Sequence, residues 1–580
     1  MSSEKSEKIE CQNCKKEFTI EPDDFSFYEK IKVPPPTFCP TCRMQRRYIW
    51  RNTMTLYSGK CGLCSKSVVT LYAPDSGITI YCNKCWWSDK WDPKSYGVNY
   101  DFSRPFFEQF IELMYKVPHM AVVNDDGIAS LNCEYTHDIW FSKNCYMCFS
   151  GWRVENVMYS FFTESGRDMM DCTIIKRDNS WLYECINCSN CYQLKHCYLC
   201  KTCVDSQFLY DCRGCSDCFM CSELRNKKYY FKNKEYGKVE YKKILADYRL
   251  DTFSGMERAK RDFKIFISDK PKKYVQTFQN VNCLGDNISN SKNSQYCFIV
   301  KNFENCRYCD FCGSDKDSYD LTVSGELSEC YEGIVVDHSQ LNLFGIFSPK
   351  CQEVKYTQHC HNCKYILGCD ALRNSNYCIF NKQYSKEEYE ELLPKIIKQM
   401  NDIPYVDKNG NIYKYGEFFP AELSPFGYNE TQAPEQIILT KEEVLKNGYK
   451  WQNNLQKTTG KETIKPEDIP ESILDVDESI LTEILSCIEC KRNYKIVKNE
   501  LIFYKKMSIP IPRRCFYCRH SSRVKFRVPH IFKLWKRSCM CEKKDHLHGD
   551  KKCEVEFETS YAPDRPEIIY CESCYQKEVY

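Results

Sequence analysis

Long apolar runs and export signals are missing from this chain of 580 residues. No stretch of about 18 residues is apolar throughout, so we expect no transmembrane helix. The opening residues, Met1 to Lys8, lack the apolar core of a signal peptide. These absences favour a cytoplasmic protein that does not contact a membrane.

Signatures of common enzyme classes are missing as well. Glycine is scarce, at 22 residues, and we find neither a P-loop nor a glycine-rich turn of the dinucleotide-binding type. There is no HExxH motif, and no spacing places two carboxylates together as an acid/base pair. We therefore expect a protein that is not an enzyme. The net charge of +3 is close to neutral and indicates nothing by itself.

Cysteine, in contrast, is abundant, with 42 residues. In a small secreted protein this number would predict a disulfide framework. Because no export signal is found, thiolates held by metal in a reducing compartment are the better interpretation.

Paired Cys-x2-Cys motifs occur near both ends of the chain. In each copy, 24 residues separate the first pair from the second. Two thiolates three residues apart chelate one edge of a tetrahedral Zn²⁺, and four thiolates leave no position for water, so such sites are structural. Iron–sulfur is the minor alternative. The three regular sites are Cys11, Cys14, Cys39 and Cys42; Cys61, Cys64, Cys82 and Cys85; and Cys487, Cys490, Cys515 and Cys518.

A fourth site at the C-terminal end departs from this pattern. Its predicted ligands are Cys539, Cys571 and Cys574, completed by either Cys541 or Cys553. His546 and His548 lie in the same insertion, and a catalytic role for them is the less favoured alternative. One ion at each site predicts four Zn²⁺ in all.

Two stretches inside the zinc modules are strongly basic. Lys30 to Pro74 contains eight Lys/Arg and Leu501 to Cys541 contains eleven, with no acidic residue in either. In a treble-clef arrangement, arginines after the second Cys pair would share one helical face, and aromatic residues are interleaved with them, as phosphate contact and base stacking require. Alternatively, these cations balance the formal charge of −2 at each zinc–thiolate site. The candidate nucleic-acid-binding residues are Arg43, Arg46, Arg47, Arg51, Arg513, Arg514, Arg519, Arg523, Lys525 and Arg527.

The middle of the chain is repetitive. Cysteines recur at multiples of three residues with a longer period of twelve, as in Cys188, Cys200 and Cys212. Such short periods predict a β-solenoid whose narrow core admits only small side chains. The repeat is itself duplicated 148 residues later, where Cys203 corresponds to Cys351. The solenoid cysteines are expected to be buried free thiols, with disulfides or metal ligation as alternatives.

The predicted fold is multidomain and mainly β with short helices: treble-clef or zinc-ribbon modules at both ends flank a duplicated Cys-rich solenoid. Capping signals such as Ser385 with Glu388 predict a helix after each solenoid half. The expected segments are a double zinc module (1–100), a connecting helix (101–129), two solenoid halves with helical caps (130–250 and 280–400), an extended linker arm (401–484) and a second double zinc module (485–580).

The chain resembles a family of long, Cys-rich zinc-ribbon proteins, with no established activity, that are common in bacteria of the candidate phyla. The residues that carry the likeness are Phe27-Tyr28, Val33-Pro-Pro-Pro, Cys39-Pro-x-Cys42-Arg43, Cys82-x2-Cys85-Trp86-Trp87, Tyr415-Gly-Glu-Phe-Phe-Pro420 and Glu556-Phe-Glu-Thr-Ser-Tyr-Ala-Pro563. The resemblance covers nearly the whole chain and implies a shared architecture. It supplies no activity to carry over.

Two functions are consistent with these patterns. The leading prediction is a cytoplasmic, non-enzymatic zinc protein that binds RNA, a ribonucleoprotein or single-stranded nucleic acid through its basic ends. The alternative is a protein-interaction scaffold, in which partners bind the stacked repeats and zinc only stabilises the terminal modules.

Overall fold

The computed structural model describes residues 5–125, 127–546 and 548–579. It is mainly β, with several sheets and few helices. The chain divides into two compact units. Unit 1 combines residues 1–122, 275–455 and 531–534, and unit 2 combines residues 123–274, 456–530 and 535–580. Each unit therefore joins one terminal module to the repeat region that is more distant from it in sequence.

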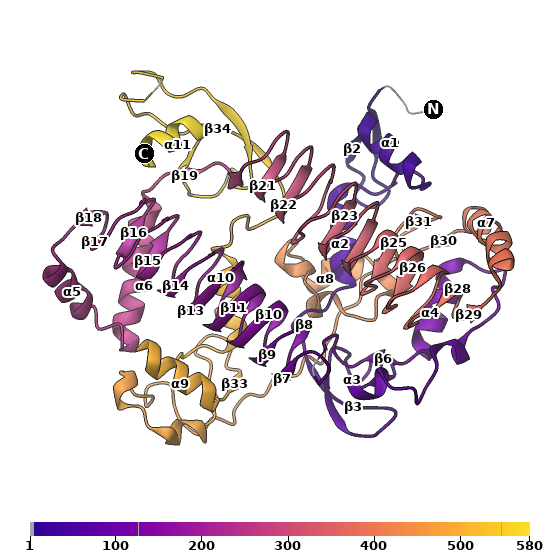
Figure 1. Ribbon diagram of the computed structural model, residues 1–580, viewed down its shortest axis with the longest axis horizontal. Helices are drawn as coiled ribbons and strands as arrows, with labels where there is room; N and C mark the ends of the chain where they lie inside the picture. The colour runs from indigo at the N-terminus through magenta and orange to yellow at the C-terminus, as the bar shows by residue number, and fades with distance from the viewer. Residues whose placement is uncertain (1–4, 126, 547, 580) are drawn as a thin grey trace. The chain divides into compact units, whose positions relative to one another are not determined.

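The repeat region of unit 2, residues 131–235, is a parallel ladder that we call the first ladder (Figure 1). Its strands are β7 (Leu131–Glu134), β8 (His137–Trp140), β9 (Lys143–Tyr146), β10 (Phe149–Met158), β11 (Phe161–Met170), β12 (Thr173–Ile175), β13 (Asn179–Tyr183), β14 (Tyr192–Lys195), β15 (Val204–Tyr210), β16 (Phe219–Ser222), β17 (Tyr230–Phe231) and β18 (Lys234–Glu235). Only the last pair, β17 with β18, is antiparallel and closes the ladder. Helices α5 (Lys238–Asp247) and α6 (Phe253–Ser268) follow; α6 was not expected from the sequence.

The repeat region of unit 1, residues 277–383, forms the second ladder. Its strands are β20 (Thr277–Phe278), β21 (Leu284–Ser289), β22 (Gln295–Lys301), β23 (Tyr319–Gly325), β24 (Tyr331–Asp337), β25 (Gln340–Ile346), β26 (Gln352–Gln358), β27 (Lys364–Leu367), β28 (Asn376–Ile379) and β29 (Lys382–Gln383). It ends in α7 (Lys386–Asp402), where Ser385 and Glu388 form the expected capping box.

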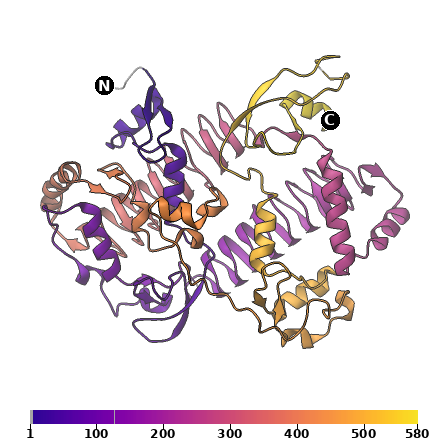
Figure 2. The same cartoon turned by 180° about the vertical axis from the view of Figure 1, so that it is seen from behind.

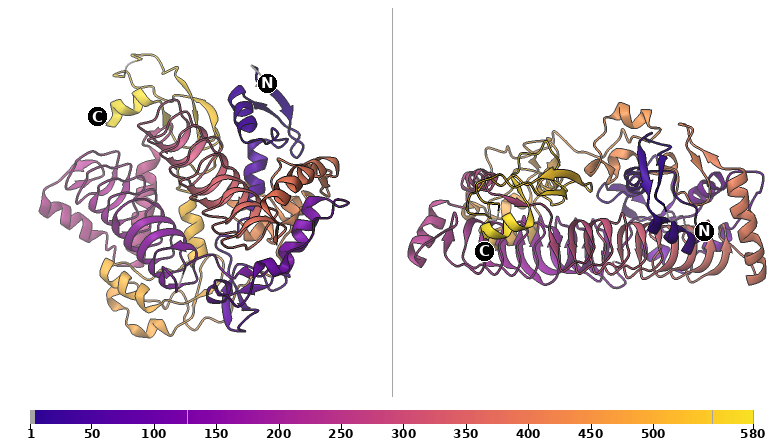
Figure 3. Two further views of the ribbon diagram at one scale, coloured as in Figure 1. Left: turned by 45° about the vertical axis from the view of Figure 1, so that its right-hand side comes forward. Right: turned by 90° about the horizontal axis from the view of Figure 1, so that it is seen from above.

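Partner strands in both ladders are offset mostly by twelve residues. Ser189 bridges Lys201, which bridges Arg213, so Cys188, Cys200 and Cys212 stand in consecutive repeats at the same register. The twelve-residue period expected from the cysteine spacing is confirmed by these registers. Figure 3 shows each ladder as a stack of narrow turns of chain.

The backbone turns a corner after every three residues. Throughout most of both ladders, every third residue has a positive φ; Asn187, Leu199 and Asp211, each just before a column cysteine, have values of 53°, 59° and 43°. Left-handed conformations cost non-glycine residues about 1 kcal/mol each, and asparagine tolerates them best. Stacked amides offset part of this cost, since the Asn144 side chain donates a 2.9 Å hydrogen bond to Asn156 one repeat later.

The interior of each ladder is filled by cysteines together with larger apolar residues, such as Leu194 and Leu209 in the first ladder and Phe303 in the second. The expectation that the core admits only small side chains is therefore wrong. Cys188, Cys200 and Cys212 are fully or almost fully buried, and none of the 42 cysteines is joined to another in a disulfide. The Cys188 thiol donates to the carbonyl oxygens of Ile186 (3.5 Å) and Cys197 (3.3 Å), a pattern that recurs through the ladders. At the interior positions that it occupies, cysteine supplies a small apolar side chain that can also donate weakly to inward-facing carbonyl oxygens.

Replacing Cys200 by Leu should destabilise the first ladder by about 2–3 kcal/mol, because extra carbon atoms overfill a close-packed column. Cys200→Ser should cost less, since Ser206 already occupies an interior position and donates to Val204. Urea unfolding followed by circular dichroism measures both. Equal effects of Leu and Ser would show that the column is not close-packed.

The N-terminal module and the segments packed around it complete unit 1. Their elements are β1 (Glu7–Glu10), β2 (Glu17–Ile20), α1 (Pro22–Lys30), α2 (Pro40–Ile49), β3 (Tyr57–Lys60), β4 (Ser67–Thr70), β5 (Ile80–Tyr81), α3 (Asn83–Trp86), α4 (Phe106–Lys116), β6 (His119–Met120), β30 (Tyr405–Val406), β31 (Ile412–Tyr413) and α8 (Lys441–Lys446), with 3₁₀ turns η1 (Pro93–Tyr96), η2 (Ala421–Leu423), η3 (Tyr428–Glu430) and η4 (Ala433–Glu435). Helix α4 is the expected connecting helix.

The C-terminal module completes unit 2. Its elements are η5 (Ile473–Asp475), η6 (Glu478–Leu481), β32 (Leu485–Ser486), β33 (Asn493–Tyr494), α9 (Lys498–Met507), α10 (Phe516–Val524), β34 (Trp535–Ser538), β35 (Glu556–Thr559), β36 (Ile569–Tyr570) and α11 (Glu572–Val579). Strand β36 pairs in parallel with β19 (Lys272–Lys273), which lies just after α6.

The expected extended arm, residues 401–484, is packed over residues 411–437, whereas most of residues 441–468 are exposed. Phe418, Phe419 and Tyr428 are almost fully buried, the Thr37 backbone amide donates to Glu417 (2.8 Å), and Ser424 donates to the Ile49 carbonyl (2.8 Å). The first part of this segment therefore belongs to the core around the N-terminal module. Among the described residues, no helix is both long and apolar enough to cross a membrane.

Candidate metal centres

Four groups of four cysteines have the geometry of closed tetrahedral sites. Within each group all four sulfur atoms lie within 4.8 Å of one another. Zn–S bonds of about 2.3 Å place two sulfurs of a tetrahedron about 3.8 Å apart, far from the bonding distance of a disulfide. In each group one sulfur of the first half lies near one of the second half: 3.7 Å for Cys14–Cys39, 3.9 Å for Cys64–Cys82, 3.6 Å for Cys490–Cys515 and 4.0 Å for Cys553–Cys571.

Helix starts position the third and fourth ligands of every site. The first cysteine of the second pair is the N-cap of α2 (Cys39), α3 (Cys82) and α10 (Cys515), and Cys571 immediately precedes α11. The partial positive charge at a helix N-terminus favours thiolates there. The Cys39 amide also donates to the Cys11 sulfur at 3.2 Å. The geometry is compatible with zinc in a structural role.

At the fourth site the sequence left open whether Cys541 or Cys553 is the fourth ligand, and the structure favours Cys553. It joins Cys539, Cys571 and Cys574 in one tetrad. The Cys571 amide donates to the Cys539 sulfur at 3.2 Å, as the Cys82 amide does to Cys61 at 3.3 Å in the N-terminal module. Cys541 is therefore not needed for this tetrad.

Three arginines of α2 are directed into the second ladder, not toward solvent. Arg43 and Arg47 both bind Asp320 of β23, each at 2.9 Å. Arg46 binds Glu332 of β24 at 2.7 Å and Glu417 at 2.9 Å. All these side chains are at most 5% exposed. Figure 1 shows α2 lying against β23.

The C-terminal module repeats this arrangement on the first ladder. Arg519 and Arg523 of α10 bind the two carboxylate oxygens of Asp171, at 2.9 and 2.7 Å. Arg523 also donates to the Tyr159 carbonyl at 3.2 Å. Figure 2 shows α10, in gold, lying across this ladder. Each module thus inserts two arginines around one buried aspartate.

In these clusters burial and the neighbouring opposite charge shift the pKa values of the side chains in opposite directions. Burial alone would lower the pKa of Arg43, but Asp320 raises it well above its ordinary value. Burial raises the pKa of Glu332 to about 7, although Arg46 opposes the rise. Removing one partner of such a cluster would leave a buried charge without compensation.

Residues that contact nucleic acid must be accessible, and most of the ten candidate residues are buried. Seven are at most 5% exposed: Arg43, Arg46, Arg47, Arg51, Arg519, Arg523 and Arg527. Arg513, which contacts Glu471, and Arg514 are partly buried, and of the ten only Lys525 is exposed. For five of the seven the physical reason is that carboxylates of the ladders bind the guanidinium groups, whereas Arg527 donates to the backbone carbonyls of Pro529 and His530. The sequence does not reveal these carboxylates, because Asp171 and Asp320 lie hundreds of residues from their partners.

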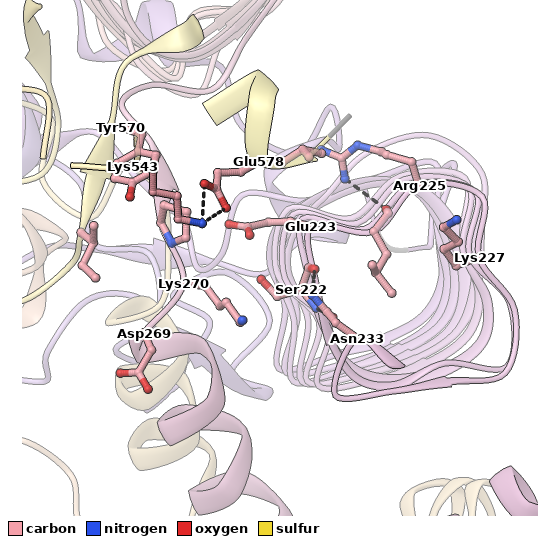
Figure 4. Close-up of a pocket in the computed structure, with 14 residues that line it drawn as sticks. Ser222, Glu223, Arg225, Lys227, Asn233, Asp269, Lys270, Lys543, Tyr570 and Glu578 are labelled. Atoms are coloured by element: carbon pink, nitrogen blue, oxygen red, sulfur yellow. Dashed lines mark hydrogen bonds and ion pairs between the residues drawn. The ribbon is translucent and has the colours of Figure 1, made fainter. Parts of the chain in front are cut away.

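A polar cleft of about 430 Å³ lies beside α11 in unit 2 (Figure 4). Lys543 and Glu578 meet in it at 2.6 Å, and burial raises the pKa of Glu223 to about 7. The described residues that line it include neither histidine nor cysteine. It therefore lacks the side chains that most often form a nucleophile–base pair.

Comparisons with known proteins add little. No family model matches the chain, and no curated protein matches it. Several solved structures match, among them a protein of Desulfovibrio desulfuricans G20 described provisionally as an acetyltransferase, with 9% identity over 47% of this chain and 75% of that chain, at a TM-score of 0.10. A superposition this poor carries no argument about fold or activity.

Proposed function

We propose that this protein is a non-enzymatic, zinc-dependent interaction scaffold of the cytoplasm. In this proposal each ladder is a β-solenoid, and a treble-clef module that contains structural zinc is clamped onto each. The observation that carries it is the repeated cluster of two arginines around one aspartate, Asp320 in unit 1 and Asp171 in unit 2. In a nucleic-acid-binding protein such arginines would contact phosphate groups. In this proposal they attach each terminal module to a ladder.

Each ladder keeps one long face outside these clusters, and we assign partner binding to it. In the first ladder, register places the mixed polar and apolar side chains of one column side by side: Leu131, Lys143, Glu155, Arg167, Ser180, Tyr192, Val204, Ser216 and Lys228. Tyr192 is 45% exposed and Val204 37%. Lys143 faces Glu155 at 3.6 Å, so the face is not a basic stripe, and a protein partner suits it better than a polyanion.

Site-specific photo-cross-linking in the native host tests this assignment. A cross-linking amino acid at Tyr192 should capture a discrete protein adduct that resists nuclease treatment. The same group at Lys243, an exposed residue of α5, is the matched control and should capture none. A nuclease-sensitive adduct at Tyr192, or equal capture at both positions, would contradict the scaffold.

Nucleic-acid binding is the second candidate, and one feature favours it. A shallow cleft of about 250 Å³ beside Cys490 and Cys518 is lined by Lys457, Arg492 and Lys525. Arg492 stacks on Tyr517 at 4.5 Å, a combination that suits a phosphate and a base. If this candidate is correct, Arg492→Ala with Lys525→Ala weakens RNA binding and flattens its salt dependence, whereas Arg519→Lys destabilises unit 2 without changing that slope.

A further inference from the structure

Seven metal-binding side chains, not four, converge in the C-terminal module. Besides the tetrad completed by Cys553, a second group brings together Cys541, His546, His548 and Cys574, with one ligand atom of each within 4.8 Å of the others. Cys574 belongs to both groups. The corresponding second site of the N-terminal module holds one tetrad only among the described residues.

Both histidines of this group direct one ring nitrogen at the same sulfur. His546 Nδ1 lies 3.2 Å from Cys541 Sγ, and His548 Nε2 lies 3.3 Å from it. A tetrahedral zinc with a Zn–N bond of about 2.1 Å and a Zn–S bond of about 2.3 Å separates its nitrogen and sulfur ligands by about 3.6 Å. The observed spacing is therefore close to that of ligands around one ion.

The remaining ring nitrogens have the partners that metal-bound histidines usually have. His546 Nε2 lies 3.1 Å from Glu578 of α11, and His548 Nδ1 lies 2.6 Å from the Lys551 carbonyl oxygen. A carboxylate or carbonyl on the outer nitrogen fixes the tautomer and leaves the inner nitrogen free to bind metal. Lys543 in turn holds Glu578, as Figure 4 shows.

We infer that the C-terminal module binds two zinc ions in one cluster, with the Cys574 thiolate bridging them. Two tetrahedra have eight corners, and seven side chains fill them when one thiolate is shared. The first ion takes Cys539, Cys553, Cys571 and Cys574. The second takes Cys541, His546, His548 and Cys574.

This arrangement explains both departures of the C-terminal module from its N-terminal copy. Cys541 replaces the regular Cys-x2-Cys spacing because it serves the second ion, and the insertion up to Cys553 supplies the two histidines. The second ion would tie the insertion to α11, since Glu578 orients His546 from that helix. The inference rests on zinc as the bound metal and is independent of what the ladders bind.

Metal analysis of the purified full-length protein tests the cluster. Native protein should contain five zinc ions per chain. Cys541→Ser and His548→Ala should each contain four, while circular dichroism and proteolysis patterns of the rest of the chain stay unchanged. His338→Ala, an exposed histidine of the second ladder, is the control and should keep five.

Two further variants test the bridge and the outer partner. Cys574→Ser should lower the content to three or make both ions of the cluster exchange rapidly with a chelator. Glu578→Gln should leave the content at five but weaken the second ion about 10- to 100-fold in chelator competition. Four zinc ions in native protein would overturn the inference, and so would five that persist in the His546→Ala/His548→Ala double variant, which would place the extra ion elsewhere.

Discussion

Replacing Cys42 by Ser is expected to unfold residues 1–60 around the first zinc site of the N-terminal module and to release α2 from the second ladder. Structural zinc supplies on the order of 10 kcal/mol to small modules, and Cys42 lies in the first turn of α2, the helix that carries Arg43, Arg46 and Arg47. Loss of the metal would therefore disorder the helix that docks the module.

Limited proteolysis and metal analysis measure this effect together. Cleavage should begin within residues 1–60, the second ladder should remain resistant, and the zinc content should fall by one ion. The matched change in the C-terminal module, Cys518→Ser, should open α10 in the same way. An intact, metal-loaded N-terminal module in the Cys42 variant would show that the ligand assignment is wrong.

Replacing Asp320 by Ala is expected to destabilise unit 1 by about 3–5 kcal/mol. The change leaves Arg43 and Arg47 buried with no carboxylate between them, and an uncompensated buried charge is more costly than the lost attraction itself. Asp171→Ala should act alike in unit 2, since Arg519 and Arg523 lose the same partner.

Chemical unfolding compares these variants with Lys30→Ala. Lys30 is 47% exposed and bridges Asp317 and Glu329, so its loss should cost no more than about 1 kcal/mol. A mild effect of Asp320→Ala, equal to that of Lys30→Ala, would show that the arginine–aspartate cluster does not hold the module.

Features set by local chemistry could be predicted from the sequence. The spacing of Cys11, Cys14, Cys39 and Cys42 is dictated by one tetrahedral ion and two tight turns, so the tetrad follows directly. The twelve-residue period follows because one repeat must stack on the next, and the α7 start follows from its capping box.

Features set by distant partners could not be predicted. The basic face of α2 looks like a solvent-exposed surface until Asp320 and Glu332 are placed against it. Each module packs on the ladder that is more distant from it in sequence, and no local sequence pattern predicts this pairing. At the C-terminal module, the sequence leaves Cys541 and Cys553 as alternatives because only one zinc ion with four ligands was expected there. In the structure the two cysteines belong to different groups of potential ligands.

The central claim is that zinc stabilises the fold of the terminal modules and that the folded modules bind the ladders. The most direct test is hydrogen–deuterium exchange before and after complete removal of zinc. The account predicts that α2 and α10 lose their protection when zinc is chelated, while the paired strands β10, β11, β23 and β24 stay protected by their parallel ladders. Unchanged protection of α2 and α10 in metal-free protein would contradict it.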